Sequence, residues 1–218
     1  SHSTTITWRT DELANSIVEF GTTSGYGQTI SDAQLVTNHS VALTGLKAST
    51  TYHYRISSTD KLGNGPTTSS DNTFTTSDII VSLPDKALDP GSTLLLPISI
   101  SDLSEQDVKS VGMTIQFDTD ILSATGVVTD GTIAAAWPAP TYSVSPGQIQ
   151  VSMSGPSALN GSGLLLKLQV QVDNNIRVGS QTALEFSSLQ LNSGATPVVT
   201  RNGSFTIKPA DIVVCAII

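Results

Sequence analysis

The stretch SVGMTIQFD, residues 110–118, alternates between apolar and polar or small side chains. A period of two residues is that of a β-strand with one buried face, because successive side chains point to opposite sides. The side chains expected to face inward are those of Val111, Met113, Ile115 and Phe117. The stretch therefore predicts a half-buried strand in an antiparallel sheet.

The same alternation recurs on both sides of this strand, near residues 93–100, 147–155, 164–172 and 183–191. Turn residues separate these stretches, as in Asn160-Gly161-Ser162-Gly163. Residues 4–76 show shorter alternating segments, also broken by turn residues. Many short strands with regular turns are typical of β-sandwiches. The sequence therefore predicts an all-β protein.

The alternation stops at Thr76-Ser77-Asp78 and resumes at Ile79, which predicts a domain boundary. We expect a first domain at residues 1–77 and a second at residues 78–209. Residues 210–218 form a short apolar tail that is an extra strand, the start of a further module or an artefact of where the chain was cut.

The composition argues against several classes of function. The chain has 18 acidic and 10 basic residues, a net charge of -8, and no run of Lys or Arg. It therefore lacks the basic surface that nucleic acids or anionic lipids require. The apolar tail is too short to cross a bilayer, so no membrane insertion is expected. Cys215 is the only cysteine, which excludes an intrachain disulfide and a thiolate metal cluster.

The residues also argue against catalysis. The histidines are His2, His39 and His53, so the second domain has none for a nucleophilic triad. His53 is expected on the outer face of its strand. Asp118, Asp120 and Asp130 lack the spacing of a calcium loop, so no cofactor is expected, with a structural calcium as the open alternative.

The first domain resembles a fibronectin type III domain of the bacterial extracellular kind. The resemblance rests on Trp8, on Leu46 six residues before Tyr52, on the Tyr-x-Tyr-x-Ile strand and on the final Phe-Thr-Thr at residues 74–76. It implies an immunoglobulin-like sandwich in which Trp8 fills the space between sheets and the Tyr52 hydroxyl ties back to the Leu46 corner. The family's first strand is absent, so it was cut away or is supplied by another segment or chain.

The second domain resembles a cohesin, a nine-stranded jelly roll that binds dockerin modules in cellulosomes and other surface assemblies. The matching pieces, in order, are Leu96-Pro97-Ile98, Phe117-Asp118-x-x-Ile121-Leu122, Gly147-x-Ile149-x-Val151-Ser152, residues 159–165 and a closing Asn-Gly-Ser-Phe-Thr-Ile at residues 202–207. The resemblance implies a non-catalytic binding or scaffolding module, extracellular or at the cell surface, with the first domain as a spacer.

In cohesins the dockerin lies across one sheet face. Carried onto this sequence, the resemblance predicts a partner-binding set of ten residues: Ser110, Gly112, Thr114, Gln116, Gln148, Gln150, Ser152, Ser154, Glu185 and Gln190. Where cellulosomal cohesins have an Asn and an Asp on the third strand, this chain has Ser110 and Gly112. The resemblance therefore implies a divergent dockerin-like module or another surface protein as the partner.

Two alternatives remain open. Trp137 and Tyr142 form a sugar-binding platform if both rings are exposed and coplanar, and the chain is then a carbohydrate-binding or adhesive module pair of a secreted hydrolase. Otherwise Trp137 covers the end of the core. The missing first strand and the apolar tail also suit a subunit of a surface filament.

Overall fold

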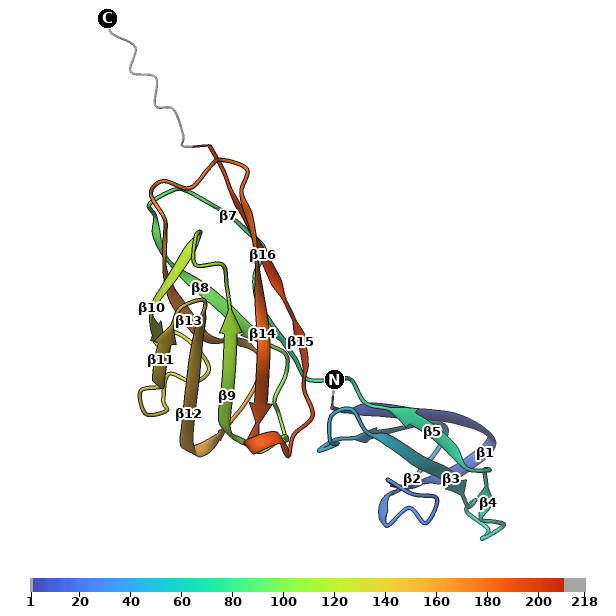
Figure 1. Ribbon diagram of the computed structural model, residues 1–218. Helices are drawn as coiled ribbons and strands as arrows, with labels where there is room; N and C mark the ends of the chain where they lie inside the picture. Colours follow the sequence, from blue (N-terminus) through green and yellow to red (C-terminus); the bar gives the residue numbers. More distant parts are fainter. Residues whose placement is uncertain (1, 210–218) are drawn as a thin grey trace, which may run out of the picture. The chain divides into compact units, whose positions relative to one another are not determined.

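The computed structural model describes residues 2–209, which fold almost entirely as β-strands (Figure 1). One 3₁₀ turn, η1 (Asn192–Gly194), follows the fourteenth strand. The chain divides into two compact units, Ser1–Asp78 and Ile79–Ile218. The predicted all-β class is confirmed, whereas the tail at residues 210–218 lies outside the described residues. No helix in residues 2–209 has the length and hydrophobicity of a membrane span.

The first unit is built from one five-stranded sheet with two long strands and three shorter ones. Its strands are β1 (Thr4–Gly21), β2 (Gln28–Leu43), β3 (Thr51–Ser58), β4 (Thr67–Thr68) and β5 (Asn72–Thr75). They are ordered β2-β1-β3-β4, and β5 also pairs with β3.

Strand β1 joins two of the short alternating segments, residues 5–10 and 16–21, whose patterns taken alone indicate two strands. Its pairing with β2 shifts register between Arg9 and Ala14 and again between Ala14 and Ser16. Such bulges bend a strand without ending it. The two halves of β1 therefore face one core, in which Ile6 from the first half and Val18 from the second are both buried.

The aromatic residues of this unit lie close to where the resemblance placed them. The Lys47 backbone N–H donates to the Tyr52 hydroxyl at 3.0 Å, which confirms the expected tie at the Leu46 corner. Trp8 is half-buried rather than enclosed, and its Nε1 donates to Ser58 Oγ at 3.0 Å. Its ring stacks on His39, with centroids 4.6 Å apart.

The second unit is a sandwich of a five-stranded and a six-stranded sheet. The five-stranded sheet has the order β10-β13-β8-β6-β15, and the six-stranded sheet has the order β11-β12-β9-β14-β16-β7. Its strands are β6 (Ile80–Ser82), β7 (Lys86–Leu88), β8 (Thr93–Ile100), β9 (Val108–Gln116), β10 (Leu122–Val128), β11 (Thr141–Ser145), β12 (Gln148–Leu159), β13 (Gly163–Val172), β14 (Gln181–Leu191), β15 (Val199–Arg201) and β16 (Gly203–Ile207).

The strand count exceeds the predicted nine because the first and last strands each divide between the two sheets. The first divides into β6 and β7 around Pro84, which has no N–H to donate to a ladder. The last divides into β15 and β16 at Asn202. The pieces pair in parallel, β15 with β6 and β16 with β7, so both sheets gain a short edge strand.

The core of this unit lies between the two sheets and is apolar. Alternate side chains of β9, β12 and β13 are buried, and Ile115, Ile149, Leu165 and Leu168 are fully enclosed. Burial of this kind contributes roughly 1.5–3 kcal/mol for each large side chain. The opposite face of the six-stranded sheet remains in contact with solvent.

Candidate partner-binding face

The solvent face of the six-stranded sheet is built by four neighbouring strands, β11, β12, β9 and β14, which lie side by side in Figure 1. Each strand places apolar side chains toward the core and polar ones outward. On β9, for example, Val111, Met113 and Ile115 are buried while the residues between them are partly exposed. The period of two in the sequence thus fixes which side chains reach this face.

The strand register brings all ten predicted partner-binding residues onto this face in rows. Ser110 lies opposite Ser154, and Gly112 lies between Ser152 and Gln190. Thr114 is opposite Gln150, and the last row is Gln148, Gln116 and Glu185. None of the ten is buried. Residues far apart in the sequence therefore form one continuous polar surface.

Gly112 lies in a shallow depression of about 520 Å³ on this surface. Nothing lies within 4 Å of the position that a Cβ at Gly112 would occupy. The depression is lined by the residues Thr114, Thr141, Gln150, Ser152, Ser188 and Gln190, among others. The missing side chain therefore leaves room for a side chain from another molecule.

The face is almost uncharged, since Glu185 is the only ionisable residue among the ten. Ser188 Oγ donates to Thr114 Oγ1 at 3.1 Å, which fixes one pair of hydroxyls. Hydroxyl and amide groups on a flat sheet can donate and accept hydrogen bonds, as at the polar parts of protein interfaces. The chemistry suits recognition of a protein surface.

Asn192 in η1 fixes the start of β9 against the end of β14. Its side-chain oxygen accepts the backbone N–H of Lys109 at 2.8 Å and that of Ser110 at 3.3 Å. Its amide nitrogen donates to the Asp107 carbonyl at 3.0 Å. This one side chain therefore positions the edge of the polar face.

Sequence reasoning missed part of this face. Strand β11 contributes Thr141 and Ser143, which lie opposite Ser152 and Gln150, and β14 contributes Ser188. The alternation in Thr-Tyr-Ser-Val-Ser was the available signal for β11. Ser188 could not be placed, because a register shift between Phe186 and Ser188 changes which residues of β14 point outward.

The predicted pair of sugar-binding rings does not form. Trp137 is only 7% exposed and its Nε1 donates to the Ser157 carbonyl at 2.9 Å. Its ring packs so closely on Gly155 that a Cβ there would lie 2.1 Å from Trp137 Cδ1. Tyr142 is 47% exposed, but a buried Trp137 cannot form a platform with it. Trp137 therefore covers part of the core, the other interpretation that the sequence allowed.

Of the acidic residues considered for calcium, Asp118 caps a turn with its carboxylate. Asp118 Oδ1 accepts the Asp120 backbone N–H at 2.9 Å, and the Asp130 carbonyl accepts a hydrogen bond from Lys167 Nζ at 2.8 Å. Within residues 2–209, no group of three or more His, Cys, Asp or Glu side chains could hold a metal ion.

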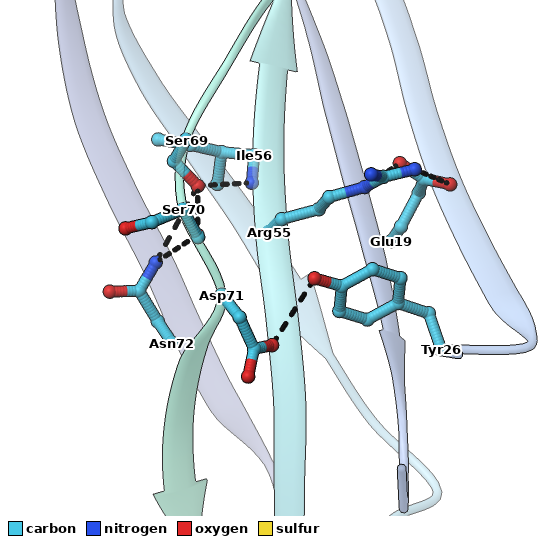
Figure 2. A network of polar contacts seen from close by, with 8 residues as sticks. All are labelled: Glu19, Tyr26, Arg55, Ile56, Ser69, Ser70, Asp71 and Asn72. Atoms are coloured by element: carbon cyan, nitrogen blue, oxygen red, sulfur yellow. Dashed lines mark hydrogen bonds and ion pairs between the residues drawn. The ribbon is translucent and has the colours of Figure 1, made fainter. Parts of the chain in front are cut away.

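A second polar cluster lies in the first unit and ties its strands together (Figure 2). Arg55 binds Glu19 through two hydrogen bonds of 2.6 and 3.1 Å, and its guanidinium lies 4.9 Å from the centre of the Tyr26 ring. The Tyr26 hydroxyl donates to Asp71 at 3.2 Å, and His53 Nδ1 lies 2.8 Å from the other Asp71 oxygen. The hydrogen bond from His53 lowers the pKa of Asp71.

His39, unlike His53, lies inside the first unit and is 2% exposed. Its two ring nitrogens lie 2.8 Å from Ser16 Oγ and 2.9 Å from Thr10 Oγ1. Burial lowers the pKa of His39, because the charged form loses its hydration. With Ser16 also buried, this Ser-His pair has no access for a substrate and acts as a support for Trp8.

Comparison with known proteins agrees with this division of the chain. Residues 1–76 match the family model of the purple acid phosphatase N-terminal domain, and residues 79–207 match that of the cohesin domain. No curated protein matches the chain. The first family's name does not show that this chain catalyses a reaction.

Several solved structures share the fold of the second unit. A non-cellulosomal cohesin from the archaeon Archaeoglobus fulgidus aligns with a TM-score of 0.52 and 20% identity, over 61% of this chain and 93% of its own. The cohesin of a type I cohesin–dockerin complex from Clostridium thermocellum aligns with a TM-score of 0.52 and 14% identity, over 60% of this chain and 99% of its own. The third cohesin of ScaC from Acetivibrio cellulolyticus, solved in complex with a dockerin, aligns with a TM-score of 0.52 and 13% identity, over 60% of this chain and 99% of its own. At these identities the likeness shows the fold.

Proposed function

Because the chain belongs to the cohesin family, we propose that its second domain binds a dockerin-like protein module through the polar face of the six-stranded sheet. The domain acts without catalysis, as a recognition module of a scaffold. The first domain acts as a spacer, and the assembly works outside the cell or at its surface.

The observation that supports this proposal is the alignment of ten outward residues from three strands into continuous rows. Cohesins in two of the similar structures are bound to dockerins. A flat surface rich in hydroxyl and amide groups suits a helical module that presents a row of polar side chains.

The centre of the face points to the nature of the partner. Gly112 leaves an open depression between Ser152 and Gln190. A partner that inserts one side chain there would bury it among polar groups, whereas a partner that needs a carboxylate on β9 would find none. We therefore expect a divergent dockerin-like module rather than one matched to the cellulosomal Asn and Asp pair.

The test is a titration of the chain with calcium-loaded dockerin modules. The panel contains the two dockerins whose complexes are named above and those from the organism that encodes this chain. Binding is measured by isothermal titration calorimetry. We expect at least one dockerin from the organism that encodes this chain to bind. Gly112→Arg fills the depression and should weaken that binding at least ten-fold, about 1.4 kcal/mol.

Ser99→Arg is the matched control, because Ser99 lies on β8 in the other sheet and is also half-buried. It should leave binding within a factor of two. No binding to any calcium-loaded dockerin in the panel would refute the proposed partner. Equal loss in both variants would show that the effect does not come from the polar face.

A further inference from the structure

Strand β11 ends the six-stranded sheet and pairs only with β12 among the strands of residues 2–209 (Figure 1). Its five residues keep one unbroken register with β12, from Thr141 opposite Ser152 to Ser145 opposite Gln148. The outer side of β11 therefore carries backbone N–H and C=O groups that no described strand takes up. Such an edge is a template for pairing with another strand.

The other edge strands of this unit have features that discourage pairing, and β11 lacks them. Strands β7 and β15 are three residues long and carry Lys86 and Arg201. Strand β10 has a register shift between Ala124 and Gly126. Charges, short length and bulges all protect edges. Strand β11, Thr-Tyr-Ser-Val-Ser, is regular and uncharged.

Apolar surface accompanies this edge. The side chains of Tyr142 and Val144 are each 47% exposed, although they lie on the side of β11 away from the polar face. A groove of about 290 Å³ next to them is lined in part by Phe117, Leu122 and Val144. A strand added beside β11 would cover apolar area and satisfy backbone groups at the same time, and both effects stabilise association.

We propose that this edge pairs with the same edge of a second copy of the chain. The sequence of β11 is self-complementary about Ser143. In an antiparallel pair with a two-fold axis there, Tyr142 faces Val144 of the second copy, and Ser143 faces Ser143. Aromatic and β-branched side chains form favourable cross-strand pairs. Strand β11 carries no charged side chain, so the pairing brings no like charges together even though each chain has a net charge of -8.

Pairing at β11 joins two six-stranded sheets into one continuous sheet. The polar faces of the two copies then lie side by side, so the dimer presents two partner-binding faces to a partner that carries two modules. Linked binding of this kind raises the apparent affinity. The pairing itself does not depend on the identity of the partner, so it can be tested without one.

The test measures self-association of the full chain by sedimentation equilibrium, at concentrations up to the order of 100 µM. We expect a monomer–dimer equilibrium. Ser143→Asp places two carboxylates opposite each other across the axis and should raise the dimer dissociation constant roughly ten-fold or more. Thr200→Asp adds the same charge to the exposed edge strand β15 and should change the constant less than two-fold.

Cross-linking locates the contact. In a Cys215→Ser background, Ser143→Cys should form a disulfide-linked dimer under mild oxidation, because residues directly opposite have Cβ atoms about 5 Å apart. Thr200→Cys in the same background should not. A chain that stays monomeric throughout this range, or a dimer that Ser143→Asp leaves intact, would overturn the proposal.

Discussion

The contact between Trp137 and Gly155 gives the sharpest prediction about stability. Both residues lie in the second unit, and Gly155 is part of β12. A Cβ at Gly155 would lie 2.1 Å from Trp137 Cδ1, 2.2 Å from its Nε1 and 2.4 Å from its Cγ. These distances are far below van der Waals contact, so Gly155→Ala must displace the indole ring.

The displacement has two costs. The ring is buried and its Nε1 donates to the Ser157 carbonyl at 2.9 Å, so moving it disturbs that bond. Inserting a methyl group into a packed core costs about 1–3 kcal/mol. Leaving a buried donor unpaired costs about 1–3 kcal/mol. Because the ring can relax in part, we expect Gly155→Ala to lower the free energy of unfolding of the second unit by about 2–4 kcal/mol.

Gly112→Ala is the matched control on the same sheet. Nothing lies within 4 Å of the added Cβ, and removing a glycine from a strand reduces the entropy of the unfolded chain. We expect a change between zero and about 1 kcal/mol in the stabilising direction. The two substitutions are chemically identical, so the difference between them measures the contact with Trp137.

The assay uses the two tryptophans, of which one lies in each unit. In a Trp8→Phe background, urea unfolding followed by fluorescence reports on Trp137 and hence on the second unit alone, which avoids assuming that both units unfold together. Adding Trp137→Leu to Gly155→Ala completes a double-mutant cycle, in which all four variants are followed by circular dichroism because the Trp137→Leu variants lack the fluorescent ring. A Gly155→Ala variant within about 0.5 kcal/mol of its parent, or a coupling energy near zero, would refute the reasoning.

Two further predictions concern the first unit, with Trp8 fluorescence as the measurement. Tyr52→Phe removes the acceptor of the Lys47 N–H and should destabilise this unit by about 1–2 kcal/mol. Tyr54→Phe, which lies outside the corner, should change the free energy of unfolding by less than about 0.5 kcal/mol. Equal effects of the two substitutions would contradict the role of the corner. The pKa of Asp71 is lowered in the folded state, so its contribution to stability is complete above the unfolded pKa of about 3.9 and is lost as pH falls toward the folded value. The free energy of unfolding of Asp71→Asn should therefore fall less steeply below about pH 4 than that of the parent. An equal slope in the two proteins would argue against the His53 contact.

The sequence by itself determined the regular strands and which of their faces is buried. The alternation in residues 110–118 placed Val111, Met113 and Ile115 in the core and their neighbours outside, as the structure has them. Local patterns suffice here because the period of two is a property of the strand backbone, whichever strand lies beside it. The order of turns and strands also sufficed for the cohesin resemblance and for the fibronectin type III-like fold of the first domain, which is the fold of the matching purple acid phosphatase N-terminal family.

Pairing between distant segments was decided only by the tertiary structure. Which residues share a row, such as Ser152, Gly112 and Gln190, depends on register, and the shift in β14 that brings Ser188 outward has no local signal. The sequence left open whether Trp137 is exposed or covers the core, and only the tertiary structure packs its ring on Gly155 of β12. Burial and register are set by contacts between residues remote in sequence, so the polar face could be expected from the strands, but its central depression and its open edge at β11 could not.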